Sequence, residues 1–230
     1  MLSKKRSSEI VGGLSKPGKM PGKAWGIPAE RCIMGSRLAK SKNAPCHKCN
    51  CYAKNGRNHM PGVKAAQERR YQLWGGDDWI EAMVTLIKGD ECFRWFDTGD
   101  LQHQDMLASI NYVAYETPDT QHWLPTQEWD MVDLFQDPIA PNLTIRKSSR
   151  RLDMVPSVSP SSMAYLTRWP DEADVCQAQL NGGECGTCRK CWDKSVPLIA
   201  YPYHRGAFHV SCIKEVFYEQ RRVPRQSQAA

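Results

Sequence analysis

The chain has 230 residues, a hydrophobic content of 41% and eight tryptophans, which excludes an intrinsically disordered protein and suffices for one large core. Its formal net charge of +6 is too modest to identify a nucleic-acid-binding protein by charge alone. No run of about eighteen apolar residues occurs and no apolar segment follows the basic N-terminus, so we expect no membrane span, no signal peptide and a cytoplasmic location.

Residues 1–22 are rich in Ser, Gly, Lys and Pro and show no hydrophobic period. We therefore expect a basic flexible arm, followed by a single α/β domain over residues 23–230. Further basic residues cluster at 146–151 and 221–225. Such patches can bind a phosphate backbone or an anionic cofactor, or they can be ordinary solvated surface. The modest net charge favours the solvated surface.

The apolar spacing after residue 60 predicts two helices and then an alternation of strands and helices. The first helix covers 62–75, and the second begins at Trp79 with Asp77 and Asp78 as its caps. The predicted strands lie at 93–96, 122–124, 142–145, 163–167 and 197–201, and the further predicted helices at 103–115, 129–135 and 212–222.

This alternation implies right-handed crossovers and a parallel sheet. The expected fold is a partial (β/α) barrel or an open parallel sheet of about five or six strands, with a Cys-rich metal loop near the C-terminus. Polar sequences follow three of the strands, at 97–100, 126–128 and 146–149. Because function gathers at the carboxyl ends of parallel strands, we expect these three segments to converge.

Eight of the ten cysteines form two tight groups, which is the strongest chemical signal in the chain. A reducing compartment disfavours disulfides, so we interpret both groups as metal sites. The remaining two, Cys92 and Cys212, stand alone in apolar surroundings typical of buried small side chains. The early group consists of Cys32, Cys46, Cys49 and Cys51, and the late group of Cys176, Cys185, Cys188 and Cys191.

The early group is a compact triplet joined by one distant cysteine. This spacing is less typical of structural zinc than of a [4Fe–4S] cluster. Three thiolate ligands would leave one iron open for a cofactor or substrate and four would close the site, and the sequence leaves both open. The late Cys-x2-Cys-x2-Cys run, with Cys176, repeats the spacing of bacterial ferredoxin loops. It favours a closed [4Fe–4S] cluster, with structural zinc as the alternative.

Several motifs, in the same order along the chain, resemble a family of bacteriophage proteins called the gene product 88 family. They lie at 27–32, 35–38, 46–54, 93–95, 99–102, 122–126 and 142–146 and end with Cys191-Trp192. The family is similar in turn to radical S-adenosylmethionine (SAM) enzymes, although it lacks their usual Cys-x3-Cys-x2-Cys spacing. In this chain Asn50 separates Cys49 from Cys51, so either thiol can complete a set that begins with Cys32 and Cys46.

The resemblance implies a SAM site at the ends of two strands. Gly99 and Asp100 are in the position where radical-SAM enzymes place a pair against the SAM amino group. Arg146 and Ser148 would bind the SAM carboxylate or ribose. The alternative for Asp100 is a helix cap, and the alternative for Arg146 is a basic surface loop.

By this resemblance the chain is an iron–sulfur enzyme that reductively cleaves SAM to a 5′-deoxyadenosyl radical for hydrogen abstraction. It would need a flavodoxin- or ferredoxin-like electron donor and would act in the host cytoplasm. A phage origin and the basic patches suggest a nucleic acid or nucleotide substrate, for instance in DNA base hypermodification. The alternative is a non-catalytic nucleic-acid- or protein-binding factor stabilised by zinc or inert clusters.

Overall fold

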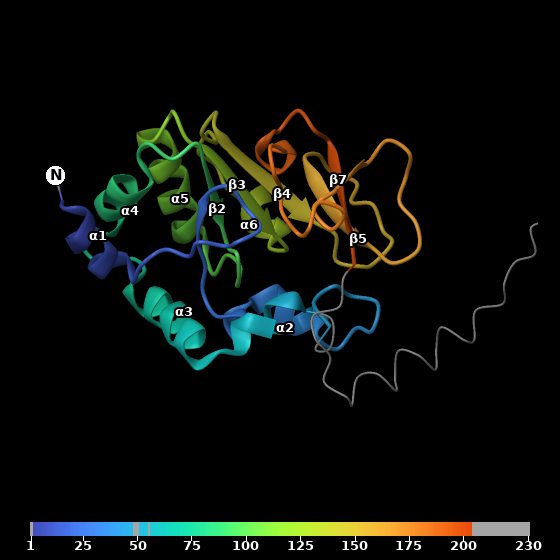
Figure 1. Ribbon diagram of the computed structural model, residues 1–230, viewed down its shortest axis with the longest axis horizontal. Helices are drawn as coiled ribbons and strands as arrows, with labels where there is room; N and C mark the ends of the chain where they lie inside the picture. Colours follow the sequence, from blue (N-terminus) through green and yellow to red (C-terminus); the bar gives the residue numbers. More distant parts are fainter. Residues whose placement is uncertain (1, 48–50, 55, 204–230) are drawn as a thin grey trace, which may run out of the picture.

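Seven parallel strands form one open sheet in the computed structural model, which describes residues 2–47, 51–54 and 56–203 (Figure 1). The strand order is β1-β2-β3-β4-β5-β7-β6, so the first five strands are neighbours in chain order. Their bounds are β1 Lys23–Trp25, β2 Cys92–Trp95, β3 Gln121–Thr126, β4 Leu143–Ser148, β5 Ser161–Tyr165, β6 Asp174–Val175 and β7 Leu198–Pro202.

The open parallel sheet confirms the predicted α/β class, but it has seven strands rather than five or six and does not close into a barrel. The two strands missed from the sequence, β1 and β6, are three and two residues long. Segments this short contain too few residues to show a period of two. They form because β1 pairs with β2 and β6 pairs with β7.

Six α-helices accompany the sheet in the described residues. They are α1 Lys4–Val11, α2 Ile33–Leu38, α3 Pro61–Leu73, α4 Trp79–Ile87, α5 Gln104–Glu116 and α6 Trp129–Asp133. The last four lie within a few residues of their predicted places. Asp78 does precede α4, but it has a φ of 61° and its side chain makes no capping hydrogen bond. The helix predicted at 212–222, with Cys212, lies outside the described residues.

The predicted flexible arm is wrong for its first half, because residues 4–11 form α1, which packs against α4. Ser3 caps the helix by accepting from the backbone N–H of Arg6, and Gly12 ends it in the left-handed conformation. Val11 is fully buried in the main core. The segment was misjudged because its few apolar residues are spread among charged ones and find partners only in the tertiary structure.

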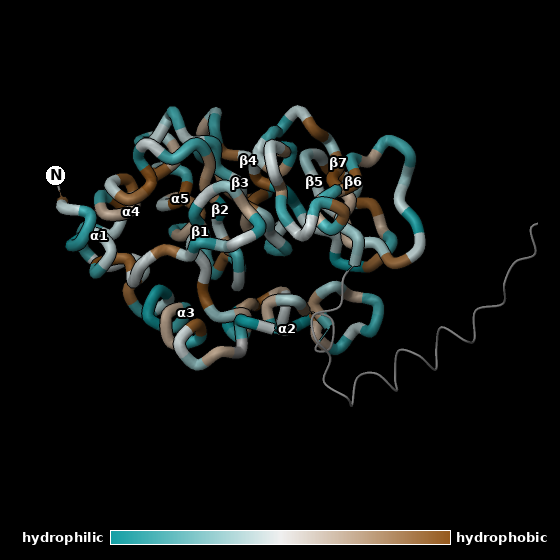
Figure 2. Tube along the Cα trace, in the orientation of Figure 1, coloured by the Kyte–Doolittle hydropathy of each residue, from teal (hydrophilic) through white to brown (hydrophobic). Residues whose placement is uncertain are grey.

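One face of the sheet packs against α4 and α5 in the main hydrophobic core. Trp25, Trp79 and Trp95 meet there, with ring centroids 5.5 to 6.4 Å apart. Apolar segments accordingly concentrate in the sheet and its helices, and hydrophilic segments in the surrounding loops (Figure 2). Loops cover the opposite face, where Trp123 and Trp192 pack with Cys92. Cys92 is thus a buried small side chain, as predicted.

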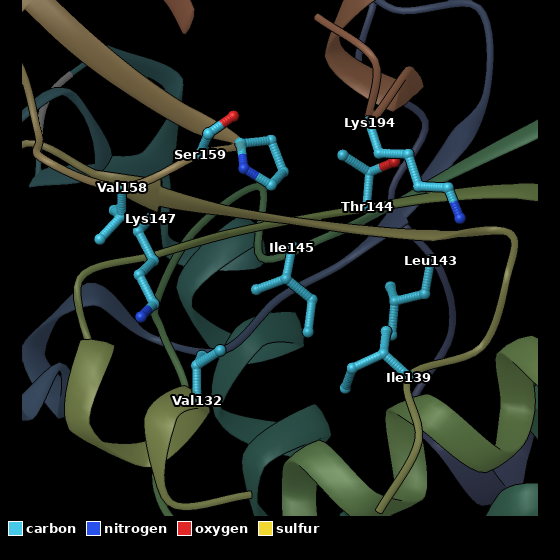
Figure 3. Close-up of a pocket in the computed structure, with 10 residues that line it drawn as sticks. Val132, Ile139, Leu143, Thr144, Ile145, Lys147, Val158, Ser159 and Lys194 are labelled. Carbon is cyan, nitrogen blue, oxygen red and sulfur yellow. The ribbon is translucent and has the colours of Figure 1, made fainter. Parts of the chain in front are cut away.

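The connection from β4 to β5 contains no helix, and a groove of about 450 Å³ opens over β4 (Figure 3). Val132, Ile139, Leu143 and Ile145 supply its apolar wall. None of the residues that line this groove is a His, Cys, Asp or Glu. The groove therefore offers no metal ligand, and its two lysines already have partners, Lys147 with the Asp133 carboxylate and Lys194 with the Pro141 carbonyl. The polar carboxyl edge of the sheet is the better candidate site.

A pH-dependent stability follows from His122 in β3, which is fully buried. Nδ1 accepts a hydrogen bond from Trp95 Nε1 (3.2 Å), and Nε2 lies 2.9 Å from Thr117 Oγ1, whose own proton is donated to the Val113 carbonyl. These partners fix the neutral ring with its proton on Nε2, and burial lowers the His122 pKa to about 3.

Because the unfolded chain binds this proton near pH 6.5, the stability that His122 contributes is lost as pH falls below that value. We expect the wild type to lose about 2 kcal/mol more than His122→Gln between pH 6.5 and pH 5, at about 1.4 kcal/mol per pH unit. Urea denaturation at the two pH values measures the difference. Parallel pH profiles for the two proteins would contradict it.

Candidate functional site

The three polar segments predicted to converge do meet at the carboxyl edge of the sheet. Asp100, after β2, accepts hydrogen bonds from Thr126 Oγ1 (2.6 Å) and from the backbone N–H of Gln127 (2.8 Å), both after β3. Gln127 Nε2 in turn donates to the Ser149 carbonyl after β4 (3.0 Å). A continuous hydrogen-bonded seam therefore joins the ends of three neighbouring strands.

Asp100 does not cap a helix, because α5 begins only at Gln104. Its carboxylate instead accepts three hydrogen bonds, the third from the backbone N–H of Leu101 (2.8 Å). Burial raises the Asp100 pKa to about 7, the three hydrogen bonds oppose that rise, and the nearby Glu128 carboxylate adds to it. Asp100 thus ties two strand ends together, and its contact with SAM stays a prediction.

Gly99 has a steric function in this edge. Its φ is +81°, and a Cβ at this position would lie 2.3 Å from Ile27 Cγ1 and 2.7 Å from the Ile27 carbonyl oxygen. Only glycine permits this approach between the loops that follow β1 and β2. The loops are joined by a hydrogen bond from the Ile27 N–H to the Thr98 carbonyl (3.1 Å).

Arg146 is not available to a SAM carboxylate. Its guanidinium is fully buried, and its five N–H donors are matched by five backbone carbonyls. The acceptors are the carbonyls of Ser161, Lys190, Cys191, Asp193 and Val196. Arg146 therefore holds the segment that follows the late cysteines. Ser148 Oγ lies 3.2 Å from Ser162 Oγ, and its role in SAM binding stays a prediction.

Three thiols of the early group gather beside the polar edge: Cys32 just before α2, Cys46 in the following loop, and Cys51 before the turn Tyr52–Lys54. The Sγ atoms of Cys32 and Cys46 lie 3.7 and 4.0 Å from the point where a Cβ at Gly35 would stand. Burial raises the pKa of all three thiols, that of Cys46 to about 12, and neighbouring thiolates add to the rise at Cys32 and Cys46. Cys49 lies outside the described residues.

A buried carboxylate positions Cys32. Glu128 Oε1 accepts a hydrogen bond from the backbone N–H of Met34 (2.7 Å), in the first turn of α2. The Glu128 N–H donates to Thr126 Oγ1 (3.0 Å), which links this contact to the seam around Asp100. The sequence indicated residues 126–128 as a polar strand end but assigned no individual role to Thr126 or Glu128.

Two buried polar atoms at this edge have no partner among the described residues: Thr98 Oγ1 and Gln127 Oε1. The two side chains are 3% and 9% exposed. An unsatisfied buried acceptor costs about 1–3 kcal/mol, so such atoms usually have a ligand or an ordered water as partner. Both lie at strand ends beside Asp100, and neither was singled out from the sequence.

The donor set of the early group fits an iron–sulfur cluster or zinc by type, because buried thiolates are the soft ligands that both prefer. None of the described cysteines forms a disulfide. Within the described ranges, no three His, Cys, Asp or Glu side chains are at positions that would hold a metal ion. The early cysteines therefore have the right chemistry for an iron–sulfur cluster or zinc, while metal ligation itself stays a prediction.

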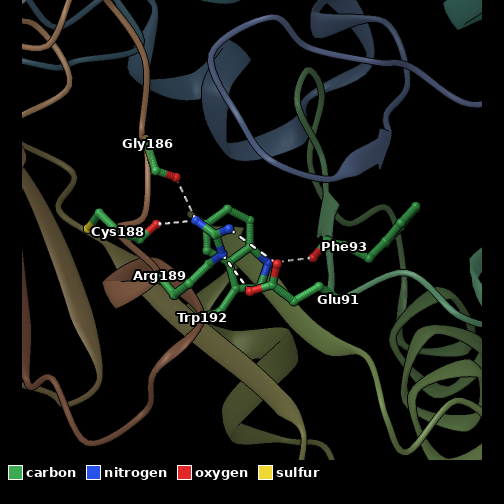
Figure 4. Close-up of polar contacts among 6 residues, drawn as sticks. All are labelled: Glu91, Phe93, Gly186, Cys188, Arg189 and Trp192. Carbon is green, nitrogen blue, oxygen red and sulfur yellow. Dashed lines mark hydrogen bonds and ion pairs between the residues drawn. The ribbon is translucent and has the colours of Figure 1, made fainter.

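The late cysteines lie in a loop that is fixed to the loop-covered face of the sheet (Figure 4). Arg189 forms a two-pronged ion pair with Glu91 (2.8 and 3.2 Å) and donates to the Gly186 and Cys188 carbonyls. Trp192 Nε1 donates to the Phe93 carbonyl of β2 (2.8 Å). The loop is therefore held in place by the protein's own contacts.

The four late thiols influence one another electrostatically. Cys176 raises the pKa of Cys185 and of Cys191, and Cys188 raises that of Cys185 further. Cys191 Sγ lies 3.1 Å from the Tyr201 hydroxyl in β7. Within the described ranges no three of these side chains are placed to hold a metal ion, so the predicted Cys-rich metal loop stays a prediction.

The family model described as gene product 88 matches residues 2–194. The chain belongs to the gene product 88 family. The match includes α1, in agreement with its packing into the core. Comparison with curated proteins and with solved structures finds no match. Among the described helices of this family member, none is long and apolar enough to cross a membrane.

Packed side chains connect the two cysteine groups across the loop-covered face. Tyr52, next to Cys51, accepts a hydrogen bond from Arg94 Nη2 (3.0 Å). The Arg94 guanidinium lies 4.5 Å from the ring centroid of Trp123. Trp123 meets Trp192, next to Cys191, with centroids 5.3 Å apart. The two groups are therefore linked by a continuous chain of contacts.

Replacing Arg146 tests its structural role. Arg146→Met leaves several buried carbonyls without a donor, so we expect it to lower the free energy of unfolding by about 3 kcal/mol or more. The matched control is Arg151→Met, because Arg151 is exposed and its side chain has no partner in the part of the chain that the structure describes.

Urea denaturation of both variants makes the comparison, and Arg146→Lys, which keeps the charge but not the planar fork, should be intermediate. Equal stabilities of the Arg146→Met and Arg151→Met variants would show that the five contacts do not hold the loop.

Proposed function

We propose that this protein is an iron–sulfur enzyme of radical-SAM type. The observation that carries the proposal is the position of three half-buried thiols near Asp100, at a carboxyl edge of a parallel sheet that also holds two unpartnered buried polar atoms of the described structure. Function gathers at this edge in α/β proteins. The chain order of the first five strands, as in a partial (β/α) barrel, supports the same proposal.

In this proposal Cys32 and Cys46, with Cys51 or Cys49, hold a [4Fe–4S] cluster whose fourth iron is open. Such a cluster, once reduced, supplies the electron that splits SAM into methionine and a 5′-deoxyadenosyl radical, which abstracts hydrogen from the substrate. The task of the surrounding residues is to bind, to orient and to exclude water.

Thr98 Oγ1 and Gln127 Oε1 are the groups we propose for the SAM amino group. An ammonium donates hydrogen bonds, and both side chains present a buried acceptor that lacks a partner among the described residues. Asp100 lies beside them and adds negative charge when ionised. Its three hydrogen bonds hold the two loops in place, so the acceptors are ordered before a ligand arrives.

The late group, Cys176, Cys185, Cys188 and Cys191, is proposed to hold a closed [4Fe–4S] cluster, with structural zinc as the alternative. Four thiolates would leave no open position, so its role would be structural or electron-relaying. The contacts from Tyr52 through Arg94, Trp123 and Trp192 support a relay between the two groups. A flavodoxin- or ferredoxin-like donor in the host cytoplasm would supply the electron.

Anaerobic purification followed by metal analysis tests the enzyme proposal. We expect a brown protein with about four irons per cluster, or about eight if both groups hold one. Addition of dithionite and SAM should release 5′-deoxyadenosine. A colourless protein with about two tightly bound zinc ions would instead support the non-catalytic binding factor. Single Cys49→Ala and Cys51→Ala variants, compared by iron content, identify the third ligand.

Thr98→Val tests the SAM site without disturbing a described contact. The change removes a hydroxyl that has no partner within the described structure and keeps the shape of the side chain. We expect about a fivefold loss of SAM affinity, the equivalent of one hydrogen bond, with unchanged or slightly higher stability.

Anaerobic equilibrium dialysis measures SAM affinity, and urea denaturation measures stability. Thr85→Val in α4 is the matched control, because its hydroxyl makes no described side-chain hydrogen bond and lies in a helix away from the edge. Equal SAM affinities of the two variants would remove Thr98 from the proposed site.

A further inference from the structure

A basic lobe lies across the carboxyl edge of the sheet. We define the cap as residues 29–73, which contain the turn Ala29–Arg31, α2, the turns Tyr52–Lys54 and Gly56–His59, and α3. Figure 1 shows α2 and α3 beyond the ends of the central strands. The Met34 N–H donates to Glu128, and the Tyr52 hydroxyl donates to the Asp97 carbonyl (3.0 Å). The cap therefore carries the early cysteines and is joined to the carboxyl edge of the sheet.

The positive charge of the protein is concentrated in this cap. It contains ten Lys and Arg against two Glu, a net charge of +8, whereas the whole chain has +6. The rest of the chain is therefore weakly acidic. This asymmetry is invisible in the overall net charge, and it gives one side of the molecule the field that attracts a polyanion.

Several of these cations are available to a partner. The two acids of the cap are already paired, Glu68 with Arg31 (2.8 Å) and Glu30 with Lys64 (3.6 Å). Arg37, Lys40 and Arg57 are exposed, and none of them forms an ion pair in the described ranges. They lie at the end of α2, in the loop after it and in the turn Gly56–His59. Three exposed cations that form no ion pair within the described ranges suit contacts with the phosphates of a nucleic-acid strand.

The cap also contains a half-exposed aromatic ring. Tyr52 is 48% exposed, although its hydroxyl is anchored by hydrogen bonds to the Asp97 carbonyl and to Arg94. Its ring is therefore held in one orientation while part of it faces solvent, directly beside Cys51. A fixed, half-exposed ring next to basic residues is a stacking platform for a nucleic-acid base.

We propose that the cap binds single-stranded nucleic acid, with phosphates on Arg37, Lys40 and Arg57 and a base stacked on Tyr52 at the entrance to the cysteine site. This inference rests on the proposed function and deepens it, because it gives the substrate class of the same site. A single or locally opened strand is required, since a base inside a duplex cannot reach a recessed site. An anionic bilayer would use the same cations but has no base to stack on a fixed ring.

The salt dependence of oligonucleotide binding tests the phosphate contacts. The probe is a fluorescein-labelled 20-nucleotide single strand, and the protein is the full chain purified anaerobically. For the triple variant Arg37→Glu, Lys40→Glu, Arg57→Glu, we expect the slope of log K against log salt to fall in magnitude by about 2, at about 0.7 per contact. Affinity at low salt should fall at least about tenfold.

A second triple variant controls for net charge. Lys4→Glu, Lys5→Glu and Lys88→Glu make the same charge change at exposed positions in α1 and after α4, outside the cap. We expect this variant to retain the wild-type slope. Equal losses in both triple variants would overturn the proposal, because binding would then follow total charge rather than the cap.

Two substitutions at Tyr52 test stacking. Tyr52→Phe keeps the ring and should bind within about twofold of the wild type, whereas Tyr52→Leu should bind about tenfold more weakly. Equal affinities of the two variants would overturn the assignment of Tyr52. Binding to phosphatidylserine vesicles with no binding to the oligonucleotide would overturn the proposal in favour of a lipid surface.

The oligonucleotide measurement is separable from the enzyme proposal. A protein without iron refutes the radical-SAM proposal, whatever the affinity for the oligonucleotide. If the protein releases 5′-deoxyadenosine, and the wild type and the cap triple variant bind the oligonucleotide equally well, only the nucleic-acid inference is refuted.

Discussion

The candidate site depends on the buried Asp100 carboxylate. It accepts from Thr126 and Gln127 and so joins the loops that follow β2 and β3. Thr126 Oγ1 also accepts a hydrogen bond from the backbone N–H of Glu128. The Glu128 carboxylate in turn accepts one from the Met34 N–H in the first turn of α2. The position of Cys32, at the start of α2, therefore follows from a chain of hydrogen bonds that begins at one desolvated acid. Any ligand at this edge meets groups that folding has already ordered.

A second buried charge has the corresponding function for the late cysteines. Arg146 donates all its N–H groups to backbone carbonyls, mostly in the segment that follows Cys188. A loop without regular secondary structure leaves many carbonyls unpaired, and burial of those groups is costly unless a donor meets them. One guanidinium satisfies four of them and the Ser161 carbonyl of β5 at once, which explains why it is buried in β4 rather than exposed at the strand end.

Within the cap, the early cysteines and the exposed cations differ in solvent access. The thiols lie where burial disfavours the free thiolate, so metal ligation would be the natural way to stabilise it. Three cations of the cap, Arg37, Lys40 and Arg57, face solvent. A recessed soft-ligand site beneath a basic surface suits a reaction on an anionic polymer, in which the surface holds the backbone and the site receives one unit.

The sequence by itself determined the parallel α/β class, four of the helices, five of the strands and the convergence of the polar strand ends, because periodicity and strand–helix alternation are local signals. It also grouped the cysteines, since their spacing is local. Only the tertiary structure decided that residues 4–11 are a packed helix and that backbone carbonyls occupy all the N–H donors of Arg146. It also decided that Thr98 and Gln127 have buried polar atoms without a partner in the described structure. These facts depend on contacts between residues far apart in the chain, and neither composition nor periodicity records such contacts.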